Sequence, residues 1–276
     1  MRLQHLALLA TSAVGLAACN GNDTGGITTT QPPLAYVRYV HAMPDTGIVD
    51  VRLVDKVENL NMFQLPYRSV TPYQGIAAGN RHFVVWVATT NPDPDPTVVQ
   101  QKLKDTTIAL EANTYYTLVE TGYARAGQLP AQHIVVLLDA APNAPAANQV
   151  SMRVVVAAPG AAAAYDVFAG GDTTTAPAGA PTFPNLSYSA TLGGTNYTGF
   201  NTGAMGLQLT ATGTTTPILG KSVVMAGTPA SGVTSAGPGS TVPGSVLTAV
   251  VFPPGVTGSP AASTRANVSY SIDRRP

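Results

Sequence analysis

Short runs of alternating side chains, each closed by glycine or proline, constrain the fold of this chain more than any other feature. In the run 35–41, Val37 and Tyr39 fall on one side of an extended chain, and Arg38 and Val40 fall on the other. Similar runs recur at 48–54, 81–88, 103–110, 115–120 and 133–138. A period of two residues is that of a β-strand, and no long segment has helical spacing. The pattern therefore predicts an all-β protein.

Composition and charge narrow the class of protein. The 276 residues include 27 glycines and 23 prolines, which separate the strand-like runs as turns do. Lys plus Arg and Asp plus Glu number 14 each, so the formal net charge is zero. A neutral chain has no basic field with which to attract nucleic acid. We therefore expect no nucleic-acid partner.

The single cysteine, Cys19, closes a short apolar segment that follows Arg2. A basic start, an apolar centre and small residues before a cleavage point are typical of a secretory signal, which we assign to residues 1–18. The run Leu16-Ala17-Ala18-Cys19 resembles the bacterial lipobox, in which the cysteine carries the lipid and becomes the first mature residue. We expect lipid attachment at Cys19 and stable anchoring in a membrane, since several acyl chains hold a protein firmly. Asn20 resembles the sorting residue of outer-membrane lipoproteins.

The rest of the chain divides into a tether and a repeat. Residues 19–33 are rich in Gly, Thr and Pro and predict a lipidated, flexible tether. Beyond it, the second half repeats the first at a domain-sized spacing, which predicts two antiparallel β-sandwich domains, immunoglobulin-like or transthyretin-like, over residues 34–144 and 145–276. The matched positions are Arg38 with Arg153, Asp50 with Asp166, Tyr73 with Tyr197, and Gly79 with Gly203.

The second copy departs from the first in one strand. The alignment places Ala230, Ser231, Val233 and Thr234, within a Gly/Ser/Pro-rich stretch, where the first copy has Tyr115, Tyr116, Leu118 and Val119. We therefore expect this strand of the second domain to be short or missing. The alternating run 265–272 is too short for a third domain and predicts a closing strand.

The motif of the first copy resembles a known family. The sequence VRYVHAMPD at 37–45, followed by VDV at 49–51, VTPY at 70–73 and AG at 78–79, is similar to the bacterial domain of unknown function 4397, as is the tandem arrangement. The resemblance implies a secreted or surface-anchored β-sandwich protein and assigns no biochemical role. The second copy has Val156 and Gly160 in place of His41 and Asp45, so an activity of these two residues would be confined to the first copy.

His41, Asp45 and Asp50 form the best candidate for chemistry. A histidine at a strand end and two carboxylates across a tight turn could act as a general base or bind a metal. The structural alternative is that they cap the strand and bond the loop backbone. Asp50 recurs as Asp166 without the histidine, which favours the structural role. We therefore predict no catalytic residue, no metal and no cofactor.

Other candidates are weaker. Phe83, Trp86, Tyr115, Tyr116 and Tyr123 could form a ligand platform, but aromatics on alternating strands are more often core. Asp93, Asp95 and Asp105 could bind calcium, but the prolines that alternate with the first two hold the loop extended and space the carboxylates along a rod. The chain lacks the Gly-x-Ser-x-Gly elbow of hydrolases, and Gly220-Lys221-Ser222 lacks the preceding glycine of a phosphate loop.

The sequence thus predicts a non-catalytic lipoprotein of the bacterial cell envelope, which displays tandem β-sandwiches to a protein or glycan partner. The alternatives are a carbohydrate- or small-ligand-binding lipoprotein and a hydrolase centred on His41. The partner, the oligomeric state and the roles of the motif residues stay open. These residues are Arg38, His41, Pro44, Asp45, Asp50, Tyr73, Gly79, Arg153, Asp166, Tyr197 and Gly203.

Overall fold

The computed structural model describes residues 32–56, 60, 62–88, 101–139, 143–170, 175–188, 196–254 and 264–276. Cys19, Asp93 and Asp95 lie outside these ranges, so the predictions made for them concern residues that the structure does not describe. No helix long and apolar enough to cross a membrane occurs in the described ranges.

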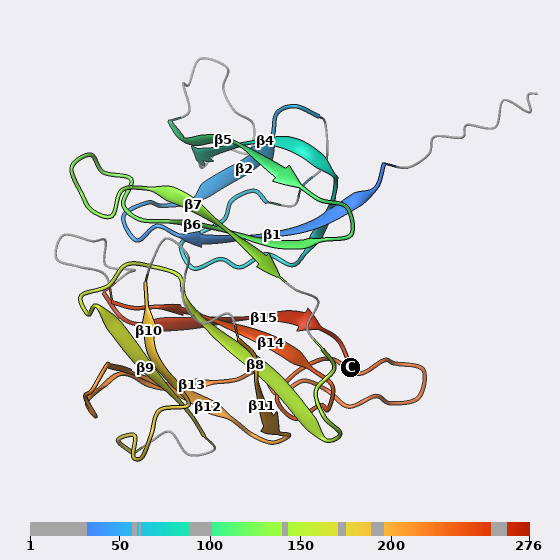
Figure 1. The fold of residues 1–276 in the computed structure, drawn as a ribbon, viewed down its shortest axis with the longest axis vertical. Helices are drawn as coiled ribbons and strands as arrows, with labels where there is room; N and C mark the ends of the chain where they lie inside the picture. Colours follow the sequence, from blue (N-terminus) through green and yellow to red (C-terminus); the bar gives the residue numbers. More distant parts are fainter. Residues whose placement is uncertain are drawn as a thin grey trace, which may run out of the picture. The chain divides into compact units, whose positions relative to one another are not determined.

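Every regular element in the described part of the chain is a β-strand, which confirms the predicted all-β class (Figure 1). The first half contains β1 (Leu34–Ala42), β2 (Val49–Leu53), β3 (Gln74–Ala77), β4 (Gly79–Val87), β5 (Lys102–Leu110), β6 (Tyr115–Thr121) and β7 (His133–Asp139). The second half contains β8 (Gln149–Val156), β9 (Ala164–Gly170), β10 (Phe183–Ser187), β11 (Thr198–Asn201), β12 (Gly206–Ala211), β13 (Pro217–Val223), β14 (Val246–Phe252) and β15 (Asn267–Arg274).

The strands form four sheets, two in each half. The first half has a sheet of order β3-β1-β6-β7 and a sheet of order β2-β4-β5, and the second has β11-β8-β14-β15 and β10-β9-β12-β13. Corresponding strands therefore occupy corresponding places. Most pairs are antiparallel, as predicted, but β1 with β6 and β8 with β14 are parallel. Side-chain alternation cannot reveal this, since it is the same in both kinds of pair.

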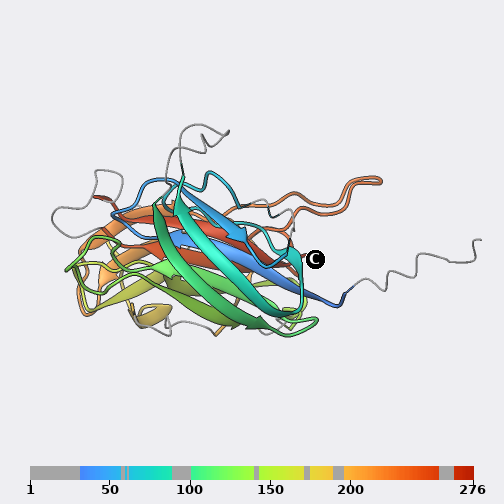
Figure 2. The ribbon, with the colours of Figure 1, turned by 90° about the horizontal axis from the view of Figure 1, so that it is seen from above.

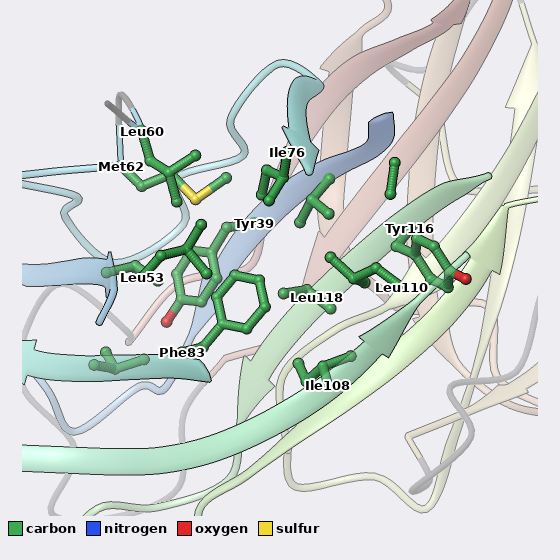
Figure 3. Close-up of a cluster of buried hydrophobic side chains, with 14 of the residues drawn as sticks. Tyr39, Leu53, Leu60, Met62, Ile76, Phe83, Ile108, Leu110, Tyr116 and Leu118 are labelled. Carbon is green, nitrogen blue, oxygen red and sulfur yellow. The ribbon is translucent and has the colours of Figure 1, made fainter. Parts of the chain in front are cut away.

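Each half has its own apolar core. In the first, side chains such as Tyr39, Phe83 and Leu118 fill the space between the two sheets (Figure 3). The second core is built in the same way around Tyr165 and Leu209. We refer to these two halves as the first and second sandwich.

A third apolar cluster joins the two sandwiches, which belong to one compact unit, Pro33–Pro276. It is formed by the outward faces of the sheets that contain β1 and β8, so these strands are buried on both sides. This explains why β1 has apolar residues at successive positions, such as Tyr39 and Val40. The cluster contains Val40, Ala42, Val119, Val135 and Leu137 from the first sandwich and Val155, Ala157, Ala158, Val250 and Phe252 from the second.

The expected loss of a strand in the second sandwich is wrong. The counterpart of β6 is β14, a fully buried strand, and not the stretch that contains Ala230 and Thr234. That stretch belongs to an insertion, residues 224–245, which connects β13 to β14 where the first sandwich has only residues 111–114. The closing strand expected at 265–272 is observed as β15, which pairs with β14.

Candidate functional site

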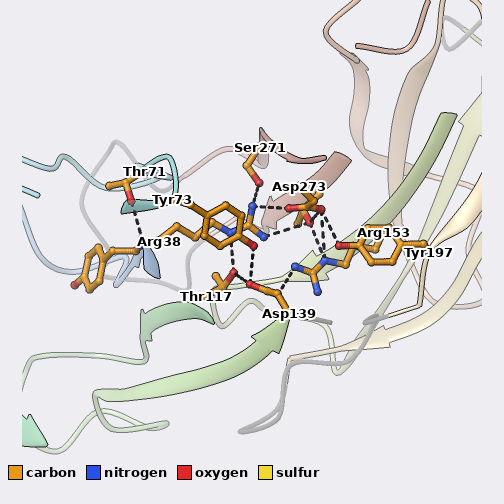
Figure 4. Close-up of polar contacts among 11 residues, drawn as sticks. Arg38, Thr71, Tyr73, Thr117, Asp139, Arg153, Tyr197, Ser271 and Asp273 are labelled. Atoms are coloured by element: carbon orange, nitrogen blue, oxygen red, sulfur yellow. Dashed lines mark hydrogen bonds and ion pairs between the residues drawn. The ribbon is translucent and has the colours of Figure 1, made fainter. Parts of the chain in front are cut away.

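Two arginines at matching positions of the repeat lie buried between the sandwiches (Figure 4). Arg38 in β1 donates from Nη1 to Oδ1 of Asp273 in β15 at 2.7 Å. Arg153 in β8 donates from Nη2 to Oδ1 of Asp139 in β7 at 2.5 Å. The side chains of all four residues are at most 4% exposed. Each arginine is thus paired with an aspartate of the other sandwich.

Threonines connect each arginine to the aspartate of its own sandwich. Nε of Arg38 donates to Oγ1 of Thr117 at 2.7 Å, and Thr117 donates to Oδ2 of Asp139 at 2.5 Å. The second sandwich repeats the arrangement at the same distances, with Arg153, Thr248 and Asp273. Arg38 also contacts Ser271 of β15. The threonine and serine hydroxyls therefore bond the guanidinium N–H groups and carboxylate oxygens that the ion pairs leave unsatisfied.

Tyrosines complete both halves of the network. The guanidinium of Arg38 lies 4.7 Å from the ring centre of Tyr73, whose hydroxyl donates to Asp139 at 2.7 Å. Arg153 lies 5.2 Å from the ring centre of Tyr197, whose hydroxyl donates to Asp273 at 2.9 Å. Burial raises the pKa of both phenols, so they stay protonated and act as donors. The network comprises Arg38, Tyr73, Thr117, Asp139, Arg153, Tyr197, Thr248 and Asp273.

The network has the reciprocity of an isologous interface, in which the same contact is made twice with the partners exchanged. Its two guanidinium groups and two carboxylates balance in charge, and each charged group has several hydrogen bonds. Buried charges are tolerated under these conditions. The recurrence of Arg38 as Arg153 and of Tyr73 as Tyr197 is therefore explained by a structural contact between the sandwiches.

His41 is fully buried at the end of β1. Its Nε2 lies 2.9 Å from the carbonyl oxygen of Gly47, to which the neutral ring donates. Burial lowers the pKa of His41 to about 4, although the bond to Gly47 and the charge of Asp45 partly oppose this shift. Its Nδ1 has no hydrogen-bond partner within the described ranges. A general base must reach a substrate, and this ring does not reach the surface.

Asp45 lies in the turn after β1 together with the buried Pro44. The carboxylate accepts hydrogen bonds from the backbone N–H groups of Ala124 and Arg125, both at 3.0 Å. Nε of Arg125 donates to it at 3.3 Å. Asp45 therefore connects this turn to the segment between β6 and β7.

Asp50 and Asp166 have the same role in the two sandwiches. Asp50 accepts from the backbone N–H of Gln64 at 2.7 Å, and Asp166 accepts from that of Asn185 at 2.7 Å. Gln64 and Asn185 have φ angles of 53° and 52°, in the left-handed region that is costly for residues other than glycine. Each aspartate thus stabilises a residue with a left-handed backbone, Gln64 in the loop after β2 and Asn185 at the irregularity of β10. Asp166 also accepts from the N–H of Gly213 at 3.0 Å.

The two motif glycines are not equivalent. Gly79, the first residue of β4, has a φ of 117°, which favours glycine strongly. Gly203 lies between β11 and β12, is not among the glycines with positive φ, and donates its N–H to the carbonyl of Ser240 at 3.0 Å.

A buried glutamate that the sequence analysis did not single out lies beside His41. In the register of β1 and β6, Glu120 is directly opposite His41. It accepts hydrogen bonds from the hydroxyl of Tyr39 and, at 2.5 Å, from Nε2 of Gln132. Burial raises the pKa of Glu120 to about 8, and the bond from Gln132 offsets part of the shift. The sequence feature that could have identified Glu120 is that it is the single charged residue in the strand-like run 115–121.

The second sandwich has an apolar pair at these positions. Val156 and Val251 are paired in the register of β8 and β14, as His41 and Glu120 are in β1 and β6. The fold therefore does not require a polar pair here, and valine fits the same place.

The proposed aromatic platform does not form. Phe83, Tyr116 and Tyr123 are buried, whereas Trp86 is only partly buried. Tyr115 stacks on Tyr36 with ring centres 4.6 Å apart. The five rings thus do not make one exposed surface.

The structure offers no metal site in the described ranges, where no group of three or more His, Cys, Asp or Glu side chains comes together. Asp105, the described member of the calcium candidate, bonds His82 at 2.5 Å and Lys102 at 2.7 Å at the surface.

Comparison with known proteins agrees with the sequence motif of the first copy. The family model described as "Domain of unknown function (DUF4397)" matches residues 35–164. The match runs from β1 to the first residue of β9, so it covers the first sandwich and the strand that carries Arg153. No curated protein matches the sequence. The protein therefore contains a domain of the DUF4397 family over residues 35–164.

Proposed function

We propose that this protein is a non-catalytic lipoprotein of the bacterial cell envelope, anchored through Cys19, that displays its paired sandwiches to a partner molecule. The observation that supports it best is that the motif residues bond to other protein side chains or to the backbone. Arg38 bonds to Asp273 across the two sandwiches, Tyr73 bonds to Asp139 in the same network, and Asp50 bonds to the backbone of Gln64. Side chains used in this way are not available to a substrate.

The anchoring part of the proposal comes from the sequence alone. The run Leu16-Ala17-Ala18-Cys19 supports lipidation, and Asn20 supports the outer membrane as the destination. A tether over residues 19–33 would hold the sandwiches at the membrane surface.

The structure gives no support to a hydrolase centred on His41. The ring is fully buried, and its Nε2 is bonded to Gly47. Asp50, the carboxylate that was its candidate partner, bonds the backbone of Gln64. A catalytic pair needs a nucleophile or a substrate within hydrogen-bond reach.

Two experiments on the full chain in bacteria test the proposal. Metabolic labelling with an alkyne-bearing palmitate should label the wild-type protein and leave Cys19→Ser unlabelled. Chemical crosslinking of intact cells should then give the same crosslinked products for the wild type and for the double variant His41→Val/Glu120→Val. This variant has valine at both positions, as the second sandwich has at the matching positions Val156 and Val251. The Cys19→Ser variant should lose these products because it is no longer held at the membrane.

Two results would contradict the proposal. An unlabelled wild-type protein would exclude the lipoprotein. Loss of the crosslinked products in a folded His41→Val/Glu120→Val variant would show that the buried pair takes part in function.

A further inference from the structure

A groove of about 390 Å³ lies beside the last strand of the second sandwich. One wall is the segment Val70–Tyr73, which leads into β3 of the first sandwich, and the other wall is residues Tyr270–Arg275 of β15 and the chain just after it. Met225 completes the lining. Both sandwiches thus contribute to the groove, and the network around Arg38 and Asp273 fixes the distance between its walls.

The groove runs along an open edge of a sheet. β15 is the terminal strand of the order β11-β8-β14-β15, and no described strand pairs with its other side. Every residue from Tyr270 to Arg275 lines the groove. Successive side chains of a strand point to opposite faces, so a groove that touches all of them follows the strand edge. Backbone N–H and C=O groups on such an edge are available for pairing with another extended chain.

The insertion 224–245 projects next to this groove. We call its hairpin, residues 226–239, the finger. It is held by bridges between Thr228 and Gly237 and between Ser231 and Thr234, and it extends away from the sheets in both views (Figures 1 and 2). The tip residue Val233 is fully exposed.

The base of the finger is closely packed. A Cβ atom on Gly239 would lie 2.2 Å from the backbone nitrogen of Gly227, so this crossing requires glycine. Met225, immediately before the finger, lines the groove and is 36% exposed. The connection at the matching place in the first sandwich, residues 111–114, is too short to hold such a hairpin. The second sandwich therefore carries an additional surface feature beside the open edge.

The accessible charge of the groove is positive. Asp273 has a side chain that is only 2% exposed and is bonded by Arg38, Thr248 and Tyr197. Arg274 and Arg275 are exposed at the end of the strand. The remaining wall is largely apolar and includes Val70, Pro72 and Ile272. A ligand that fits has an extended backbone, apolar side chains and carboxylates.

We propose that the groove binds an extended, acidic segment of a partner protein, which adds as a strand to β15 and places its carboxylates on Arg274 and Arg275. This inference rests on the proposed function and specifies the chemistry of the partner.

The test uses a phage library of random peptides, about a dozen residues long, selected against the full-length protein. Peptides of this length cover the groove in extended form, since each residue spans about 3.3 Å. We expect enriched sequences to contain Asp or Glu among alternating β-branched residues, with no proline in the paired segment. Arg274→Glu/Arg275→Glu should weaken their binding by about tenfold or more, as expected for loss of a charge-assisted contact. The matched control, Lys56→Glu/Lys221→Glu, has the same charge change at exposed sites outside the groove and should bind normally.

Three outcomes would overturn the inference: no enriched peptides, enriched peptides that bind both double variants equally, or arginine-dependent binding of an acidic polysaccharide such as polygalacturonate without any peptide binding. None of these depends on Cys19 or on His41. A protein that is lipidated and keeps its crosslinked products but fails the peptide test would refute the groove and leave the proposed function in place.

Discussion

Arg38 and Asp273 are separated by 235 positions in the sequence and form a buried ion pair at 2.7 Å between the two sandwiches. Arg153 and Asp139 make the same contact in the reciprocal direction. The positions that make the repeat recognisable in the sequence are thus partly those that hold its two copies together.

Replacing Arg38 by methionine removes one member of a buried ion pair, so the negative charge of Asp273 is less well neutralised. We expect the free energy of unfolding to fall by about 3 kcal/mol, the usual effect of breaking a buried pair. Urea denaturation measures this change. Lys102→Met is the control, because Lys102 pairs with Asp105 at the surface and such pairs contribute about 0–1 kcal/mol. Equal effects of the two substitutions would contradict a structural role for Arg38.

The raised pKa of Glu120 predicts that its contribution to stability is lost as pH rises through neutrality. Its pKa in the folded protein is about 8, above the ordinary value of 4.5. The folded state therefore holds a proton that the unfolded state releases, and the contribution of Glu120 to stability decreases as pH rises from about 4.5 to about 8. In the wild type this decrease is seen above about 6.5, where the opposite contribution of His41 ends. The slope is at most about 1.4 kcal/mol per pH unit. Glu120→Gln should remove this slope in denaturation measured at several pH values, whereas Glu111→Gln, in an exposed loop, should keep it.

His41 predicts the opposite change on the acid side. Burial lowers its folded pKa to about 4 from 6.5, so the unfolded state binds the proton more readily. The contribution of His41 to stability should therefore fall as pH decreases from about 6.5 towards about 4, which opposes the contribution of Glu120 where the two ranges overlap, from about 4.5 to about 6.5. His41→Val should remove this decrease, since Val156 occupies the matching place in the second sandwich. A variant with the wild-type acid profile would show that His41 is not the group responsible.

Substitution of the two motif glycines, Gly79 and Gly203, tests the effect of backbone strain, because only Gly79 has a positive φ. Gly79→Ala places a side chain at a φ of 117° and should cost about 1–3 kcal/mol. Gly203→Ala has open space around the new Cβ and no positive φ, so its cost should be within about 0.5 kcal/mol. Thermal unfolding of both variants compares them directly. Similar destabilisation of the two would show that Gly79 is not retained for its backbone conformation.

The sequence predicts some of these features and not others, for physical reasons. Alternation identifies strands because the period of two follows from strand geometry, and the repeat identifies Arg38 and Arg153 because they occupy matching positions. The repeat does not identify the partners of these arginines, Asp139 and Asp273, because each arginine pairs with an aspartate of the other sandwich. It also placed the counterpart of β6 within the finger, because β14 follows an insertion that has no equivalent in the first half.

A double-mutant cycle on Arg38 and Asp273 tests the central claim most directly. Arg38→Ala, Asp273→Ala and the double variant are compared with the wild type by urea denaturation of the full chain. The exchanged ion pair predicts that the effects of the single substitutions differ from additivity by at least about 1.5 kcal/mol, as for groups in one buried network. Effects that add to within about 0.5 kcal/mol would contradict it.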